Sequence, residues 1–377
     1  MTNRPNQLEF DRIAYTLRTQ STPISWANIA LAIGVSGESV ARASAQRHQI
    51  RHNLPALTIP SARRSNAGRA VALGRWNSSI PTSSAWTFGV EIEFQKTSRL
   101  AVAEELERVF GRHIHLYPYH AHENSRNGGC VICSFPSSGY SDWKVETDGS
   151  VSQNTHTPTG HGGEVVSPVL TIDRIAEIDI VVKAIKAVGG KATVKCGLHV
   201  HIGVAHLTHS QRASIVAQWE QAQHAVKNFV SPSRRYTVGS WSGRSNGYWC
   251  KDTGSTEVQQ IIQVLSDTTL LPKTKELKDK LGRVTEKYRG LNVLPLAKIG
   301  TFEVRLHQGT LSATKIKAWV ELLIAFFEFA STVHTSSLAL TTEPDYFLKT
   351  LEEKASLKSV VVKRYTKSAE AFSQRSH

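Results

Sequence analysis

Residues 89–94 read Gly-Val-Glu-Ile-Glu-Phe, residues 197–202 read Gly-Leu-His-Val-His-Ile, and residues 301–306 read Thr-Phe-Glu-Val-Arg-Leu. In each stretch, polar or ionisable residues alternate with large apolar ones. This alternation predicts a β-strand, because side chains two residues apart in a strand point to the same face. The three stretches therefore predict a sheet with one face packed against a core and one face lined by ionisable groups.

Each predicted strand places two ionisable side chains on that second face. The pairs are Glu91 and Glu93, His199 and His201, and Glu303 and Arg305. One interpretation is a half-exposed sheet whose charges face water. The other is a metal site, because carboxylates that lie close together repel each other unless a cation lies between them. Mg²⁺ and Mn²⁺ prefer oxygen ligands and in enzymes often bind the phosphate groups of a substrate. An arginine beside the metal would neutralise the charge of a phosphoryl group during its transfer.

From residue 86 onward, predicted strands and helices alternate, which indicates a mixed α/β domain. We expect strands at 86–95, 142–147, 163–168, 193–204, 289–294 and 299–307. We expect helices at 98–110, 171–188, 208–230, 256–266, 273–285 and 312–334, and a basic helical segment at 345–376. The Gly-, Ser- and aromatic-rich tract 235–255 is expected to be a long ordered loop.

The length of 377 residues favours two domains. The sequence contains no apolar run of about 18 residues and begins with a polar segment, so we expect a cytoplasmic protein that does not contact a membrane. Four cysteines are too few for a disulfide scaffold and are expected to be reduced.

The first 85 residues contain ten arginines, no lysine and three acidic residues, and the whole chain has a net charge of +14. Within residues 1–54, a helix ending at Gly34 and a second helix starting after Ser36 follow the helix-turn-helix pattern. This basic module is expected to bind nucleic acid, the alternative being a three-helix bundle that contacts protein. Residues 55–85, rich in Pro, Ser, Arg and Gly, are expected to be a linker.

Six blocks of sequence follow one another after residue 86. They read Phe-Gly-Val-Glu-Ile-Glu-Phe at 88–94, Trp-Lys-Val-Glu-Thr-Asp-Gly-Ser at 143–150, Gly-Gly-Glu-Val-Val-Ser-Pro at 162–168, Cys-Gly-Leu-His-Val-His at 196–201, Tyr-Arg-Gly-Leu-Asn at 288–292 and Thr-Phe-Glu-Val-Arg-Leu-His-Gln-Gly-Thr at 301–310. In this order the blocks resemble the amidoligase family, a branch of the carboxylate–amine ligases related to glutamine synthetase and glutamate–cysteine ligase.

The resemblance implies an α+β fold, with a glutamine-synthetase-like curved antiparallel sheet that forms a partial barrel and is packed by helices. It places the catalytic domain at 86–340, followed by a helical extension at 341–377. It also implies a reaction in which ATP phosphorylates a carboxylate and an amine displaces the phosphate. The partners would be ATP, Mg²⁺ or Mn²⁺, an amine, and a small-molecule or peptide carboxylate.

The resemblance also implies roles for individual residues. The metal ligands would be Glu91, Glu93, Glu164 and Glu303. Arg305 would stabilise the γ-phosphoryl group, and His199, or its neighbour His201, would contact metal or phosphate. Asp148 and Ser150 would lie near the amine or the carboxylate, and Arg289 and Asn292 would orient substrate or nucleotide. The alternatives are a turn-forming role for Asp148, a strand-end cap for Asn292 and a solvated surface position for Arg289.

Two other functions stay open from the sequence. A zinc hydrolase could use His199, His201 and a glutamate, and a nucleic-acid-binding protein could have a non-catalytic C-terminal domain. Cys130 and Cys133, which follow several histidines including His113 and His115, could bind zinc, the alternative being two buried thiols in a loop.

Overall fold

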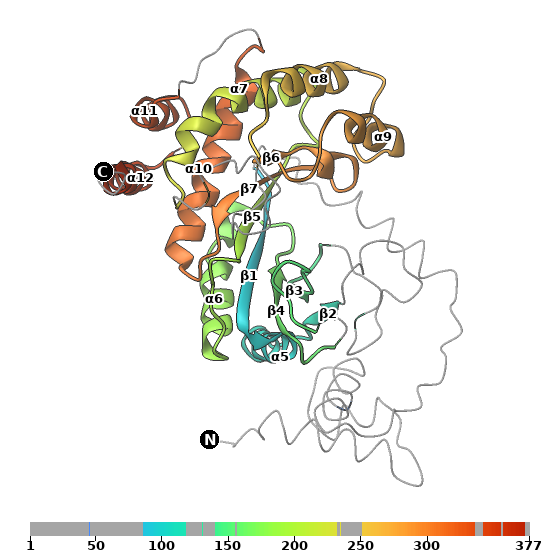
Figure 1. Cartoon of the computed structure of the whole chain (residues 1–377), viewed down its shortest axis with the longest axis vertical. Coiled ribbons are helices and arrows are strands. Elements are labelled where there is room, and N and C mark those ends of the chain that lie inside the picture. The colour runs from blue at the N-terminus through green and yellow to red at the C-terminus, as the bar shows by residue number, and fades with distance from the viewer. Residues whose placement is uncertain are drawn as a thin grey trace, which may run out of the picture. The chain divides into compact units, whose positions relative to one another are not determined.

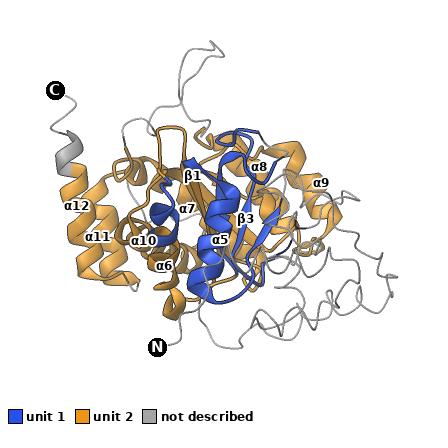
Figure 2. Ribbon diagram, turned by 90° about the horizontal axis from the view of Figure 1, so that it is seen from below, with its two compact units in different colours: residues 1–85, 95–168, 183–190 blue, residues 86–94, 169–182, 191–377 orange. Residues whose placement is uncertain are grey.

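The computed structural model describes residues 45, 86–117, 130, 140–154, 157–231, 234, 251–335, 342–355 and 357–373. Apart from residue 45, the predicted helix-turn-helix module and linker lie outside the described residues, as does most of the predicted loop 235–255. The chain divides into two compact units (Figure 2). The first unit contains residues 1–85, 95–168 and 183–190, and the second contains residues 86–94, 169–182 and 191–377.

The described residues form a seven-stranded sheet with the order β2-β3-β4-β1-β5-β7-β6 (Figure 1). Its strands are β1 (Phe88–Ser98), β2 (His115–Tyr117), β3 (Lys144–Glu146), β4 (His161–Val166), β5 (Gly197–Gly203), β6 (Leu291–Asn292) and β7 (Thr301–Gln308). The β2–β3 pair is parallel, whereas β3–β4, β1–β5, β5–β7 and β6–β7 are antiparallel. The sheet is therefore mixed, and the prediction of a wholly antiparallel sheet was wrong at β2, a short strand that the sequence pattern did not reveal.

The helices lie close to their predicted positions. They are α5 (Arg99–Phe110), α6 (Glu177–Ala187), α7 (His209–Lys227), α8 (Ser255–Ser266), α9 (Lys275–Val284), α10 (Ala313–Thr332), α11 (Pro344–Lys354) and α12 (Ser359–Ser373), with short 3₁₀ turns η1 (Ile172–Arg174) and η3 (Leu294–Ala297). The predicted helix 171–188 divides into η1 and α6, and the predicted segment 345–376 divides into α11 and α12. No helix among the described residues is long and apolar enough to cross a membrane.

In the second unit, α7 and α10 pack against each other, and α10 also packs against β5 (Figure 1). The contact is aromatic: Trp219 of α7 meets Phe326 of α10 edge to face, and Phe302 of β7 meets Phe327 of α10. All four side chains are fully buried. This apolar layer covers one face of β5 and β7, so His199, His201 and Glu303, which alternate with the apolar residues before the bulge, must lie on the other face.

The pairing of β5 with β7 contains a β-bulge. Between two flanking residue pairs of this ladder, β5 contributes one residue, His199, while β7 contributes two, Arg305 and Leu306. A bulge of this kind bends its strand and re-aims the side chains near it.

The bulge changes which face the end of β7 presents. Phe302 contacts Phe327 of α10, and His307 contacts Trp319 of the same helix, with ring centroids 5.1 Å apart. Strict alternation would place residues 302 and 307 on opposite faces, because they are five positions apart. The extra residue of β7 removes that difference, and His307 is buried against the helix.

In the first unit, the buried side chain of Arg99, at the start of α5, forms hydrogen bonds to the backbone of the segment that leads into β4. Its guanidinium donates to the carbonyls of Gly162 (2.6 Å), Thr157 (2.6 Å) and Asn154 (2.8 Å). Burial lowers the pKa of Arg99 to about 10, so the group stays charged at neutral pH. Gly163 packs directly on the Arg99 side chain, where a Cβ atom would come within 2.9 Å of it.

Candidate active site

The second unit brings ionisable residues of β1, β5 and β7 into register. Glu91 of β1 lies opposite His199 of β5, and His201 of β5 lies opposite Glu303 of β7. Glu303 in turn lies opposite Asn292 of β6. Four adjacent strands therefore place polar side chains side by side; the alternation in the sequence predicted this for β1, β5 and β7 but not for β6.

His199 lies among three carboxylates. Its Nδ1 atom is 2.9 Å from Oε2 of Glu91 and 3.5 Å from Oε1 of Glu303, and its Nε2 atom is 3.6 Å from Oε1 of Glu93. The His199 side chain is only 2% exposed. Three carboxylates around one buried imidazole concentrate negative charge in a place where water screens it poorly.

His201 contacts the second carboxylate oxygen of Glu91, so each oxygen of Glu91 has a histidine partner. Its Nε2 atom is 3.1 Å from Glu91 Oε1, and its Nδ1 atom is 3.0 Å from the hydroxyl of Thr301. Burial alone would raise the pKa of Glu91, but the hydrogen bonds from His199 and His201 hold it well below its usual value. Burial would lower the pKa of His201, but the hydrogen bond and charge of Glu91 and the charge of Glu303 raise it. The pair therefore favours an ionised Glu91 beside a His201 that holds its proton more strongly than a free imidazole does.

Glu303 and Glu93 are each held by a donor from a neighbouring strand. Asn292 donates its side-chain N–H to Glu303 at 2.7 Å, and the guanidinium of Arg305 binds the other oxygen of Glu303. The backbone N–H of Gly197 donates to Oε2 of Glu93 at 2.6 Å. Donors fixed on strands therefore hold both carboxylates in place.

The donor set fits a divalent cation. Glu91, His201 and Glu303 each offer a ligand atom, and these atoms lie within 4.8 Å of one another. Carboxylate oxygens from two strands suit a hard cation such as Mg²⁺ or Mn²⁺, and an imidazole beside them also suits Zn²⁺. The guanidinium of Arg305 supplies a positive charge beside Glu303.

Three of the predicted site residues lie in the first unit. Glu164 lies on β4 opposite Glu146 and is buried. Asp148 accepts the backbone N–H of Ser150 at 2.6 Å and also binds its hydroxyl. This is the arrangement of an Asx turn, so the Asp-Gly-Ser segment has the turn-forming role that was one of its two interpretations. Substrate roles for Asp148 and Ser150, and a metal role for Glu164, stay predictions.

Arg289 and Asn292 lie in different surroundings. Arg289 pairs with Glu257 of α8 at 2.8 Å and donates to the carbonyl of Asp252 at 3.0 Å. Its guanidinium thus joins α8 to the chain before β6. Asn292 belongs to the cluster, since its side-chain N–H donates to the carboxylate of Glu303. Both residues have well-defined structural contacts, and their predicted contact with substrate or nucleotide stays a prediction.

Two features of the site were missed from the sequence. Thr301 binds His201, and its position two residues before Glu303 could have revealed it, since both side chains belong to the same strand face. The bulge that places Arg305 and Leu306 opposite His199 has no glycine or proline to mark it. Such irregularities cannot be read from an alternating pattern alone.

Carboxylates, imidazoles and a guanidinium on adjacent strands, backed by packed helices, form a polar sheet face whose donor set suits a cation. The chain belongs to the amidoligase family: the model of the family described as "Putative amidoligase enzyme" matches residues 84–327. None of the curated proteins matches the chain.

Among solved structures, the chain is similar to the glutamine synthetase of Plasmodium falciparum, determined by electron cryo-microscopy. The identity is 10% and the TM-score 0.33, over 81% of this chain and 74% of that chain. A TM-score this low does not establish a common fold, so the predicted partial barrel stays a prediction.

Proposed function

We propose that this protein is an ATP-dependent carboxylate–amine ligase whose active site is the cluster around His199. Membership of the amidoligase family supports amide-bond formation. The observation that supports this location is the convergence of Glu91, Glu93 and Glu303 on one buried imidazole. A buried group of carboxylates is costly unless it holds cations, so it marks a functional site more often than a structural one.

The proposed reaction has two steps. An oxygen of the substrate carboxylate attacks the γ-phosphorus of ATP, the bond to the β,γ-bridging oxygen breaks, and ADP leaves. This gives an acyl phosphate, in which a poor electrophile has gained a good leaving group. The amine nitrogen then attacks the acyl carbon, the carbon–oxygen bond to phosphate breaks, and the nitrogen loses a proton. The site must hold these groups in line and exclude water from the acyl phosphate.

The side chains of the cluster divide these tasks. Glu91, Glu93 and Glu303 would hold Mg²⁺, which when bound neutralises the phosphate oxygens of the nucleotide. Arg305 is 18% exposed and already carries its charge beside Glu303, so it can turn a donor toward a phosphoryl group. Asn292 keeps Glu303 oriented, and His199 and His201 keep Glu91 ionised. The amine and the carboxylate substrates are a small molecule or a peptide, and the basic residues 1–85 are proposed to bind nucleic acid.

The test is ATP turnover by the full chain in Mg²⁺ against pooled amino acids and polyamines, with ADP and the amide product read by mass spectrometry. Glu91→Gln keeps the size of the side chain and removes its charge. We expect it to reduce turnover by at least about 100-fold, comparable to the loss of one preorganised charge in an active site. Glu276→Gln on the surface of α9, where the side chain is 66% exposed, is the matched control and should leave turnover unchanged.

The result also separates the ligase from a hydrolase. ADP formation that requires both an amine and a carboxylate, with a product heavier than either, supports the ligase. Zinc-dependent hydrolysis without ATP would refute the ligase in favour of the hydrolase. Normal ATP turnover by Glu91→Gln would remove the cluster from the mechanism.

A further inference from the structure

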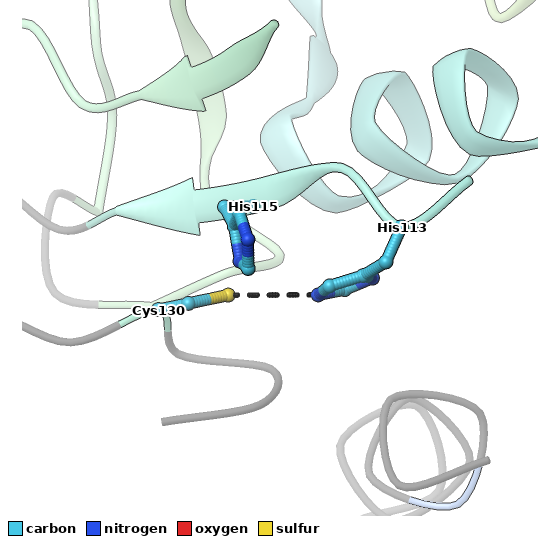
Figure 3. Close-up of side chains that lie close together, drawn as sticks. All are labelled: His113, His115 and Cys130. Atoms are coloured by element: carbon cyan, nitrogen blue, oxygen red, sulfur yellow. Dashed lines mark hydrogen bonds between the residues drawn. The ribbon is translucent and has the colours of Figure 1, made fainter. Parts of the chain in front are cut away.

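A second group of metal-ligating side chains lies in the first unit. His113 lies just before β2, His115 is the first residue of β2, and Cys130 follows on a later segment of the chain. Figure 3 shows that the three side chains point toward one another. Each offers a ligand atom, and these atoms lie within 4.8 Å of one another. The sequence had suggested a zinc site of Cys130 and Cys133 with the histidines before them; Cys133 lies outside the described residues, and the structure brings Cys130 to His113 and His115.

The spacing of these atoms is close to that of a tetrahedral metal site. Zinc–sulfur and zinc–nitrogen bonds of about 2.3 and 2.0–2.1 Å, at the tetrahedral angle, separate the sulfur from the nitrogen by about 3.6 Å. Cys130 Sγ lies 3.9 Å from His113 Nε2. The ring centroids of His113 and His115 lie 4.9 Å apart and almost perpendicular, at 83°, so both imidazoles can present a nitrogen to one point. A shift of a few tenths of an ångström would bring Cys130 Sγ and His113 Nε2 to the separation of two ligands on one zinc ion.

The surroundings of these ligands also match a metal site. Glu107 of α5 binds the far ring nitrogen of His113, with Oε2 2.7 Å from Nδ1, and both side chains are nearly buried. A carboxylate that holds the second nitrogen of a histidine fixes its orientation and makes it a stronger ligand. The backbone N–H of Leu116 donates to Cys130 Sγ at 3.3 Å and so helps to fix the position of the sulfur.

Cys196 shows what a buried thiol looks like without such ligands. It is the other cysteine among the described residues, and it is as completely buried as Cys130. Its thiol contacts the backbone N–H and the hydroxyl of Thr193, and burial raises its pKa. Burial of a cysteine therefore does not require the histidine pair or the carboxylate behind it, and these need a separate explanation.

We propose that His113 Nε2, a ring nitrogen of His115 and Cys130 Sγ bind a zinc ion, with Glu107 as the residue that positions His113. Binding releases the thiol proton of Cys130 to solvent, and both imidazoles coordinate in their neutral form. Three protein ligands leave one tetrahedral position for water or another exchangeable ligand. The ion joins β2 to the segment of Cys130, and it is distinct from the proposed magnesium site because its donors are sulfur and nitrogen.

The test is metal binding by the untagged full chain after chelator treatment. Co²⁺ is added in the presence of excess Mg²⁺, and Zn²⁺ is then used to displace it. We expect one equivalent of Co²⁺ to give a thiolate-to-cobalt charge-transfer band and intense tetrahedral ligand-field bands, both lost on adding Zn²⁺. Cys130→Ser should abolish the charge-transfer band, whereas the matched control Cys196→Ser should retain it. Glu107→Gln should weaken Zn²⁺ binding about 10–100-fold while the bands keep their shape.

A protection experiment covers the case in which Cys130→Ser fails to fold. In the unaltered protein, Zn²⁺ should slow alkylation of Cys130, located by peptide mass spectrometry, and His115→Ala should remove that protection. Retention of the cobalt bands in Cys130→Ser, or equal alkylation of Cys130 with and without Zn²⁺, would overturn the proposal. These readouts do not involve ATP or amide formation, so they are independent of the proposed ligase activity.

Discussion

Replacement of His307 should change how the stability of the protein depends on pH. The imidazole of His307 is buried against Trp319, and its Nδ1 atom donates to the carbonyl of Gln308 at 2.6 Å. Burial lowers the pKa of His307 to about 4, and the positive charges of Lys315, Arg234 and Arg364 add to this effect. The folded protein therefore keeps this side chain neutral in mild acid.

The sign and size follow from the two pKa values. In the unfolded chain, His307 takes up its proton near its ordinary pKa of 6.5, whereas in the folded chain it does so only near 4. Between these values the unfolded state binds more protons, so the free energy of unfolding decreases as the pH falls. The contribution is about 2 kcal/mol at pH 5 and approaches about 3 kcal/mol below pH 4, at about 1.4 kcal/mol for each pKa unit.

The assay is urea denaturation followed by circular dichroism at pH 7.5 and pH 5, for the unaltered protein, His307→Gln and His307→Phe. Gln keeps a hydrogen-bond donor and Phe keeps the ring, so the two variants differ in stability at pH 7.5. Both should nevertheless lose about 2 kcal/mol less than the unaltered protein on going to pH 5. An equal loss in all three proteins would mean that His307 titrates normally, and the bulge-dependent burial would then be wrong.

Three further substitutions test the packing around the sites by thermal or urea denaturation. Arg99→Met should cost about 3 kcal/mol or more, because several buried carbonyls lose a charged donor; a loss below about 1 kcal/mol would show that water replaces the guanidinium. Gly309→Ala should cost about 2 kcal/mol or more, since its Cβ would lie 2.7 Å from a neighbouring carbonyl oxygen, while Gly254→Ala, with nothing within 4 Å, should be nearly neutral. Thr208→Ala should cost about 1 kcal/mol by removing the capping box of α7, and Ser312→Ala, an N-cap without a side-chain hydrogen bond, should cost much less.

The sequence predicted the strands that build the site because the signal there is local. Glu91, His199 and Glu303 each lie in a stretch where large apolar residues alternate with ionisable ones, and alternation needs no knowledge of the rest of the chain. The register that places them opposite one another depends on long-range pairing. The sequence assigned the three strands to one sheet, but it did not predict which residues lie opposite one another.

The parts that were not predicted depend on tertiary contacts. β2 has three residues and no alternation long enough to detect, and its histidine was recognised only as one of several near Cys130. Arg289 was expected at a substrate, but the sequence gives no sign that Glu257, some thirty positions away, would pair with it. Side-chain partners that are distant in the chain are set by packing, which a pattern of single residues does not encode.

The unequal count of residues opposite His199 has a consequence for how this sheet can vary. Deleting either Arg305 or Leu306 would make the ladder regular and leave the flanking pairs as they are, so His307 would still lie on the side of the aromatic helix. Pairing the full-length strand without the bulge would instead turn His307 toward the acidic side of the sheet, because five positions separate it from Phe302. This part of β7 can therefore lose one residue without exchanging the faces of the residues that follow, whereas loss of the bulge at constant length would exchange them.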